Sequence, residues 1–110
     1  MRLVTLGSAL WLLLMETGAE VELRTFRFRD PVIEISAGEE VRWTNRDAIG
    51  HTVTSGTPAH PDTLFDGRLE HAGAGFAHRF DQAGTYPYFC ARHRFMRGHV
   101  RVLPHSNGAR

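Results

Sequence analysis

The 110-residue chain has one cysteine, no lysine and a formal net charge of only +1. A single cysteine excludes a framework of disulfide bonds within the chain. The small net charge argues against a general nucleic-acid-binding protein, which normally carries a large basic excess. The length predicts a single domain, and a composition that is 42% hydrophobic and 23% charged is typical of a globular protein.

The chain also lacks an apolar run long enough to span a bilayer, which needs about 20 residues. Its longest run, "LVTLGSALWLLLM" at residues 3–15, follows an arginine and precedes small residues at Thr17 and Ala19. This pattern is typical of a signal peptide. We therefore expect a signal peptide at residues 1–19, cleaved near Ala19, and a single domain at residues 20–110 that is exported to the periplasm. An uncleaved anchor is the alternative, and lipid attachment is excluded because no cysteine lies near this site.

The lone cysteine is unusual for an exported chain. Cysteines that meet an oxidising compartment usually occur in pairs as disulfide bonds, but Cys90 has no second cysteine to pair with. It is therefore a buried inert side chain, a bridge to another chain, or a metal ligand.

Beyond Ala19, short segments of β-branched and aromatic residues alternate with Gly, Pro and Asp, and no segment keeps a helical period. Residues 56–74 are predicted as a long crossover with only a short extended piece around "LFDG". Several short strands joined by turns predict an all-β fold, an antiparallel β-sandwich. The segments predicted as strands are residues 21–28, 32–36, 41–45, 51–55, 75–80, 85–90 and 99–103.

The stretch "YFCARHRFMRG" at residues 88–98 carries Cys90, with His93 three residues later and Met96 three beyond that. Cys90 ends a predicted strand and the next strand begins near residue 99, so a short loop can turn all three side chains toward one centre. Thiolate, imidazole and thioether are soft ligands, which suit copper and not Ca²⁺ or Mg²⁺. A second imidazole would complete the ligand set of a blue-copper electron-transfer site, and His51 at the start of a predicted strand is the candidate.

The segments "WTNRDAIGHTVTS", "FDGRLEHAGAGFAHRFDQAGTYPYFC" and "CARHRFMRGHVRV" resemble the small blue copper proteins, the cupredoxins. The interval Cys-x2-His-x2-Met is similar to that of the amicyanin branch, and the chain is also plastocyanin-like. The resemblance extends from about Phe26 to Leu103 and implies a Greek-key sandwich with one type 1 copper near one end. The ligands that it implies are His51, Cys90, His93 and, more weakly, Met96.

The resemblance also implies supporting roles. Asn45 is expected to tie the ligand-bearing loops together, and the backbone N–H of Thr52 is expected to donate to the Cys90 sulfur. A turn and a tyrosine corner, both structural, are expected at Asp81, Gly84 and Tyr86.

Four protein ligands leave no open coordination position for a substrate, so we expect an electron carrier and not an enzyme. The resemblance implies that electrons pass through His93 within an apolar patch, which is expected to comprise Phe95, Ile49, Pro58 and Ala59. The partner is expected to be a dehydrogenase, a cytochrome or an oxidase, and the chain is expected to be a monomer.

Relatives commonly have proline directly after this histidine, whereas here Arg92 and Arg94 flank His93. Together with Arg97 and Arg46, they are expected to form a basic rim that steers an acidic partner. Because like charges disfavour the charged form, Arg92 and Arg94 are also expected to lower the pKa of His93.

Two other functions use the same residues. A periplasmic copper-handling or delivery protein would employ the same ligands without moving electrons. A thiol enzyme with Cys90 as nucleophile and His93 as base would lack a third group to orient the base, and it would give Met96 no role. A binuclear copper centre would need a second bridging cysteine, which the sequence lacks.

Overall fold

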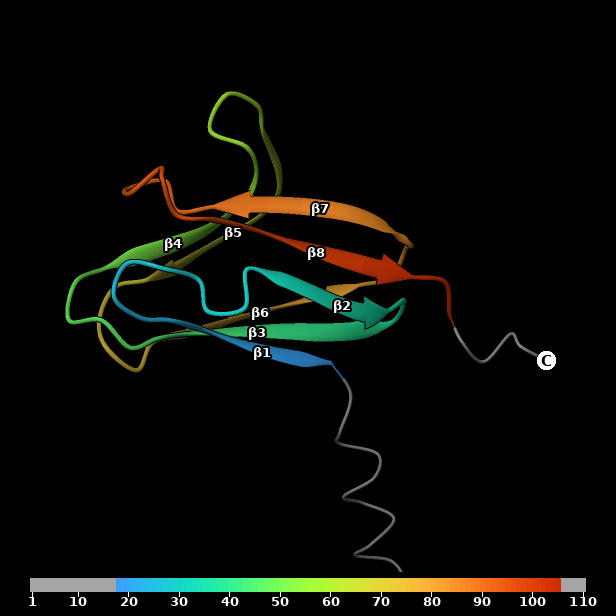
Figure 1. Cartoon of the computed structure of the whole chain (residues 1–110), viewed down its shortest axis with the longest axis horizontal. Coiled ribbons are helices and arrows are strands. Elements are labelled where there is room, and N and C mark those ends of the chain that lie inside the picture. Colours follow the sequence, from blue (N-terminus) through green and yellow to red (C-terminus); the bar gives the residue numbers. More distant parts are fainter. Residues whose placement is uncertain (1–17, 106–110) are drawn as a thin grey trace, which may run out of the picture.

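The computed structural model describes residues 18–105 as eight strands in two sheets (Figure 1). Residues 1–17 of the expected signal peptide lie outside the described residues. Within the described part, no helix has the length and apolarity needed to cross a membrane. One sheet has the order β1 (Ala19–Leu23), β3 (Glu39–Asn45) and β6 (Gly75–Phe80). The other sheet has the order β2 (Val32–Ser36), β8 (Arg97–Leu103), β7 (Gly84–Phe89), β4 (His51–Gly56) and β5 (Pro61–Leu69).

The prediction of an all-β sandwich is confirmed, but the sheets are mixed and not purely antiparallel. β1 pairs with β3 in parallel, and β2 pairs with β8 in parallel. The reason is that the chain leaves the first sheet after β1, forms β2 in the second sheet and returns for β3. Two changes of direction separate β1 from β3, so the two neighbours run the same way.

The predicted crossover at residues 56–74 is wrong, because it contains the nine-residue strand β5, which pairs with β4 in antiparallel register. The inward positions Phe65, Gly67 and Leu69 are buried while the residues between them are exposed. Gly67 faces the ring of Phe76 so closely that an added Cβ would lie 2.2 Å from it. One inward position of this strand is a glycine and the outward positions carry charged residues. The sequence therefore lacks the regular series of apolar side chains from which a strand is predicted.

The first strand is shorter than predicted. β1 ends at Leu23, and residues 24–31 form a loop that crosses to the second sheet. Thr25 and Phe26 in this loop both have positive φ, 51° and 57°, a conformation that is uncommon for residues other than glycine. Phe28 returns to the core, where it is buried and bridges Leu23.

The core lies between the two sheets around Trp43, which is fully buried. Its ring contacts those of Phe65, Phe76 and Tyr88, with centroids 5.3–5.9 Å apart. The predicted tyrosine corner is present, because the Tyr86 hydroxyl donates to the Gln82 carbonyl at 2.7 Å. These contacts make the two sheets a rigid support for the loops at their ends.

Three loops meet at one end of the sandwich, namely residues 24–31, residues 46–50 and residues 90–96 (Figure 1). β1 begins and β8 ends at the opposite end. The hairpin between β4 and β5 projects from the second sheet, away from the three loops. The loop end is therefore where residues from distant parts of the chain come together.

Candidate metal centre

Three of the four predicted ligands converge at the loop end. The ligand atoms that His51, Cys90 and His93 offer all lie within 4.8 Å of one another. The two Nδ1 atoms of the histidines are 3.2 Å apart. The Cys90 Sγ atom lies 3.8 Å from His51 Nδ1 and 3.6 Å from His93 Nδ1. Within residues 18–105, this is the one cluster of His, Cys, Asp and Glu with a spacing that suits a metal ion.

The spacing fits a single ion at the centre of this triangle. Imidazole nitrogen and thiolate sulfur bind such ions at about 2.0–2.3 Å, which places three ligands in a plane about 3.5–4.0 Å from one another. The three distances, 3.2, 3.6 and 3.8 Å, are close to that range. Two imidazoles and a thiolate in this arrangement are the equatorial donors of a blue-copper site.

The sheet brings His51 and Cys90 together although 39 positions separate them. His51 is the first residue of β4, and Cys90 directly follows β7, which pairs with β4. Both side chains are fully buried. The long separation is closed by strand pairing, which sequence spacing alone does not reveal.

The 90–96 loop, which carries both His93 and Met96, is closed by backbone hydrogen bonds. The backbone N–H of Met96 donates to the His93 carbonyl at 2.9 Å, and the N–H of Cys90 donates to the Met96 carbonyl at 3.1 Å. These two bonds close the loop on itself, and the Met96 side chain is buried. The thioether is thus held inside the protein, on the loop that also carries Cys90 and His93.

The Cys90 sulfur is hydrogen-bonded as expected. The backbone N–H of Thr52 donates to Sγ at 3.4 Å, and the Thr52 hydroxyl accepts from the N–H of Ala91 at 2.7 Å. An N–H directed at the sulfur draws charge from a thiolate and adjusts its donor strength. Thr52 therefore fixes the position of Cys90 from two sides.

Asp47 is a part of the site that the sequence analysis missed. Its Oδ2 atom lies 2.8 Å from His51 Nε2, and its two oxygens also accept the backbone N–H groups of Thr25 and Phe26 at 2.7 and 2.9 Å. A carboxylate at Nε2 holds the proton there, which leaves the Nδ1 lone pair of His51 facing Cys90 and His93. Burial alone would raise the pKa of Asp47, but these hydrogen bonds outweigh it and the pKa lies below the usual value of 3.8.

Asn45 was expected to tie the ligand-bearing loops together. Its hydrogen bonds reach the loop before His51 but not the 90–96 loop. Its buried side-chain amide donates to the carbonyls of Ile49 at 3.0 Å and Leu69 at 3.2 Å, and its oxygen accepts the N–H of Asp47 at 2.9 Å. These bonds join the loop before His51 to the end of β5. The connection to the 90–96 loop is made instead by Thr52.

The apolar patch around His93 contains Phe26, which was not predicted there. The Phe26 ring lies edge-on to both histidines, with centroids 5.3 Å from His51 and 4.9 Å from His93, and is 37% exposed. Phe95 is 70% exposed and its ring centroid lies 6.3 Å from that of His93. Pro58 and Ala59 lie beyond Gly56, at the end of β4 opposite to His51. Their predicted place in the patch is therefore wrong, and the left-handed turn that brings Phe26 in has no signature in the sequence.

The four arginines of the predicted rim differ in their partners. Arg92 is paired with Glu70 at 2.7 Å, and Arg46 is paired with Glu22 at 3.2 Å. Arg94 and Arg97 form no ion pair with any carboxylate of residues 18–105. Half of the expected basic rim is thus neutralised within the protein.

His93 is the half-buried member of the cluster. Burial, the neighbouring His51 and the charge of Arg92 lower the pKa of His93 below 6.5, while Asp47 opposes them. The charge of Arg92 thus acts on His93 in the expected direction, and the effect of the two flanking arginines on this pKa in the reduced copper protein stays a prediction.

Comparisons with known proteins agree with this site. The family model of copper binding proteins of the plastocyanin/azurin family matches residues 15–103. The chain is 35% identical to amicyanin-alpha of Methylorubrum extorquens over 76% of its own length and 70% of that protein. It is 34% identical to amicyanin of Paracoccus versutus, where the match covers 74% of the chain and 62% of the relative, less than two thirds of its length.

Solved structures show the same architecture. A purple cupredoxin from Nitrosopumilus maritimus superposes with a TM-score of 0.71 at 27% identity, covering 76% of this chain and 98% of that one. The crystal structure of amicyanin from Paracoccus versutus gives a TM-score of 0.65 at 30% identity, covering 80% and 82%. The chain therefore belongs to the copper-binding plastocyanin/azurin family, with copper as its cofactor, and falls among the blue copper electron-transfer proteins and not among enzymes.

Proposed function

We propose that the chain is a periplasmic one-electron carrier in which His51, Cys90, His93 and Met96 hold a single type 1 copper. The observation that carries this proposal is the convergence of two imidazole nitrogens and a thiol sulfur within 4.8 Å, at distances that fit one ion. Met96 is buried in the same short loop and offers the weak fourth donor.

When bound, copper supplies a couple between Cu(II) and Cu(I) that accepts or gives one electron. The protein's own residues hold the ligands in place. Asp47 fixes the ring of His51, Thr52 fixes the Cys90 sulfur, and two backbone hydrogen bonds close the 90–96 loop. Side chains that are already positioned need little rearrangement on a change of charge, which favours rapid electron exchange.

His93 is the part of the site through which electrons would leave. It is less buried than His51 and Cys90, and its ring lies next to the exposed side chains of Phe26 and Phe95. A redox protein that docks on this surface would approach the site through one imidazole ring. A dehydrogenase, a cytochrome or an oxidase is the class of partner proposed, and the chain acts as a monomer.

Two observations support the proposal that the chain is exported. They are the apolar run before Thr17 and the position of the proposed cleavage site. Ala19 is the first residue of β1, so cleavage after it leaves Glu20–Leu23 to pair with Arg42–Asn45. The paired length of β1 is thus almost unchanged in the mature domain of residues 20–110.

Visible absorption spectroscopy tests the function directly. The purified protein is mixed with Cu(II), and its spectrum is recorded before and after ascorbate and again after reoxidation. We expect an intense blue band that bleaches and returns, and no such band in a Cys90→Ser variant. A colourless protein would overturn the proposal. A blue protein that transfers copper to an acceptor faster than it exchanges electrons would instead support copper delivery.

A further inference from the structure

We propose that Asp66, an exposed carboxylate on β5, is a positioning residue for the Cys90 ligand. It acts through the hydroxyl groups of Thr54 and Thr52, and these three side chains are here called the hydroxyl network. The proposal rests on the proposed function, because it assigns Asp66 a role at the copper site. It adds a carboxylate that is not a ligand and that lies exposed on the edge strand of the five-stranded sheet.

Three hydrogen bonds lead from the ligand loop to the surface of β5. The backbone N–H of Ala91 donates to the Thr52 hydroxyl oxygen at 2.7 Å. The hydroxyl oxygens of Thr52 and Thr54 lie 2.9 Å apart, and the Thr54 hydroxyl donates to Asp66 Oδ1 at 2.8 Å. Thr52 is also the residue whose N–H donates to the Cys90 sulfur. The hydroxyl network therefore ends at the peptide group that directly follows the thiolate ligand.

Strand geometry places the three side chains of the network on one face of the sheet. Thr52 and Thr54 are two positions apart on β4, and side chains with this spacing point to the same face of a strand. Asp66 is the register partner of Thr54 on β5, so the two side chains lie directly opposite each other. Thr52 is buried, Thr54 is half-buried and Asp66 is exposed. The network thus leads from the interior to solvent along paired strands.

The carboxylate sets the direction of the hydroxyl bonds. An ionised carboxylate only accepts, so Thr54 uses its one proton on Asp66 and its oxygen accepts the proton of Thr52. The Thr52 oxygen is then free to accept the N–H of Ala91. In the opposite direction the Thr52 proton would face that N–H, which cannot accept it, and a buried hydroxyl without an acceptor is unfavourable. Asp66 therefore keeps Thr52 in the role of acceptor.

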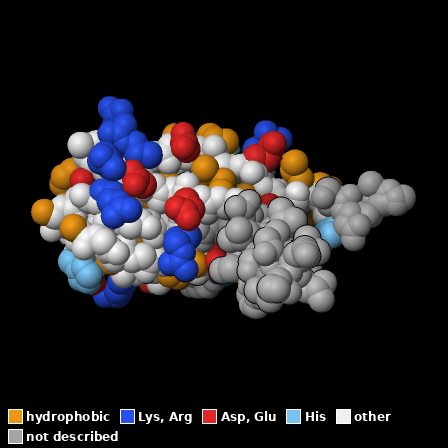
Figure 2. Space-filling model, turned by 90° about the horizontal axis from the view of Figure 1, so that it is seen from below, with side chains coloured by type: hydrophobic (Ala, Val, Ile, Leu, Met, Phe, Trp, Pro, Cys, Tyr) orange, Lys and Arg blue, Asp and Glu red, His pale blue; other side chains and the backbone are white. Residues whose placement is uncertain are grey.

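Asp66 has no competing partner that would withdraw it from this role. Figure 2 shows acidic and basic side chains lying next to one another on one face of the molecule, and several carboxylates of the protein are paired with arginines. Within residues 18–105, however, Asp66 forms no ion pair, and Thr54 is its one hydrogen-bond donor. Its acceptor capacity is thus available to the hydroxyl network.

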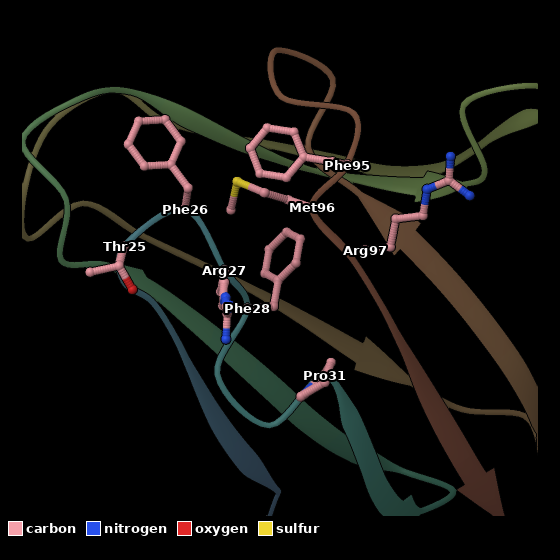
Figure 3. A pocket seen from close by; sticks show the side chains of 8 residues that line it. All are labelled: Thr25, Phe26, Arg27, Phe28, Pro31, Phe95, Met96 and Arg97. Carbon is pink, nitrogen blue, oxygen red and sulfur yellow. The ribbon is translucent and has the colours of Figure 1, made fainter.

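The two ends of the 90–96 loop are held by different kinds of contact. Met96 is buried at a groove, and in Figure 3 its thioether ends between the rings of Phe26 and Phe95. Apolar contacts of this kind have little directional preference, whereas a hydrogen bond weakens steeply when its angle departs from linear. The peptide group that follows Cys90 is held by such a directional bond to Thr52. The orientation of the thiolate therefore depends on how firmly the Thr52 hydroxyl is fixed.

Amide hydrogen exchange of the metal-free protein, measured by NMR, tests the network without copper. Exchange of the Ala91 N–H should accelerate about fivefold in Asp66→Ala and in Thr54→Val, because each variant removes one bond of the network. Asp66→Asn keeps an oxygen acceptor and Thr54→Ser keeps the hydroxyl, so both should stay within about twofold of the parent. An equal acceleration at Val100, on β8, would show only a loss of overall stability and would overturn the proposal.

The copper-loaded protein gives a readout that a purely structural role would not change. Thr54→Val and Thr54→Ser carry the same charge as the parent, so the loss of a carboxylate cannot account for a difference between them. The reduction potential of Thr54→Val should fall below that of the parent, because a less firmly placed N–H at the sulfur stabilises the electron-rich Cu(I) state less. Its Cu(I) affinity, measured by competition with a chelator, should fall about three- to tenfold. Thr54→Ser should match the parent in both.

Two further variants separate the network from general effects of charge. Glu34→Ala is the matched control, because it removes an exposed carboxylate that is paired with Arg101, and it should leave the exchange of Ala91 unchanged. Asp66→Ala added to Thr52→Val should accelerate that exchange no further than Thr52→Val alone, since both act through one network. Unchanged exchange in Asp66→Ala, or equal effects of Asp66→Asn and Asp66→Ala, would overturn the proposal.

The blue absorption band of the parent protein is recorded first. A missing band contradicts the proposed function, while the exchange measurements on the metal-free protein still test the network. A normal band together with unchanged exchange of Ala91 in Asp66→Ala contradicts the role of Asp66 alone.

Discussion

Arg92 reaches Glu70 by lying across Gly50. The guanidinium donates to the Glu70 carboxylate at 2.7 Å, and an added Cβ at Gly50 would lie 2.4 Å from Arg92 Nη1 and 3.1 Å from Glu70 Oε1. The ion pair therefore joins the 90–96 loop to the end of β5 over the residue that precedes His51. Because the side chains of Arg92 and Glu70 are 39% and 51% exposed, solvent screens the pair and it contributes little to folding.

Substitution of Gly50 by alanine should separate this ion pair without unfolding the protein. The atom nearest to the new methyl group is the tip of a flexible side chain, so Arg92 moves aside and the free energy of unfolding changes little. Gly67→Ala is the matched control, since its methyl group meets the Phe76 ring at 2.2 Å and should cost about 1–3 kcal/mol. Urea unfolding of both variants gives the comparison.

The ion pair between Arg92 and Glu70 also predicts that the effects of substituting Gly50 and Arg92 on stability are coupled. In a double-mutant cycle, Arg92→Ala added to Gly50→Ala should have almost no further effect on stability, because the first change has already broken the ion pair. Additive losses would show that the two residues act independently.

Removal of the Asp47 carboxylate should weaken both the fold and the metal centre. Asp47→Ala leaves the N–H groups of Thr25 and Phe26 and the buried Nε2 of His51 without their acceptor, which should cost about 2–4 kcal/mol of folding free energy. Copper affinity, measured by competition with a chelator, should fall about 10- to 100-fold. Asp47→Asn keeps one oxygen acceptor and should lose clearly less of both. Equal losses for the two variants would contradict the role of this carboxylate as an acceptor.

His93 should titrate below its ordinary range in the metal-free protein. Burial, His51 and Arg92 lower its pKa, so the unfolded chain binds more protons than the folded one below about pH 6.5. The stability of the metal-free protein should therefore fall as the pH drops from 6.5 toward the pKa of folded His93. Proton NMR should show a higher pKa of His93 in Arg92→Ala than in the parent protein, and equal values would refute the contribution of Arg92.

The two tyrosines should respond oppositely to loss of the hydroxyl group. Within residues 18–105 the buried Tyr88 hydroxyl forms no hydrogen bond of ordinary geometry. Burial raises its pKa to about 12, although the nearby indole N–H of Trp43 acts in the opposite direction. Tyr88→Phe should therefore be neutral or raise the free energy of unfolding by up to about 1 kcal/mol. Tyr86→Phe removes the bond to Gln82 and should cost about 1 kcal/mol. Thermal or urea unfolding of the two variants measures both effects. A large loss of unfolding free energy in Tyr88→Phe would show that this hydroxyl has a hydrogen-bond partner.

The sequence predicted the features of the site that depend on residues close to one another in the chain. The interval from Cys90 through His93 to Met96 already places three soft donors on one short loop, and the structure closes that loop with two backbone bonds. The position of His51 at the start of a strand was also readable, because β-branched residues follow it. Its approach to Cys90 depends on the pairing of β4 with β7, and the resemblance to a known family supplied that step.

The parts that the sequence did not reveal depend on contacts between distant segments. Asp47 and Phe26 meet because a left-handed turn at Thr25 brings residues 24–31 over the site, and no local pattern encodes that turn. β5 was missed because Gly67 occupies an inward position. The partner of Arg92 was unpredictable for the same reason, since Glu70 belongs to another loop.

The start of β1 and the end of β8 lie at the end of the sandwich opposite to the three loops (Figure 1). A chemical linker joined to the mature protein before Glu20 or after Leu103 would therefore attach it to a solid support with His93 directed toward the solution. Such a film should remain accessible to dissolved redox proteins. Because the whole length of the sandwich would separate the metal centre from the support, direct electron exchange with an electrode should be slow in this orientation, and it should accelerate when the linker is moved to the loop end.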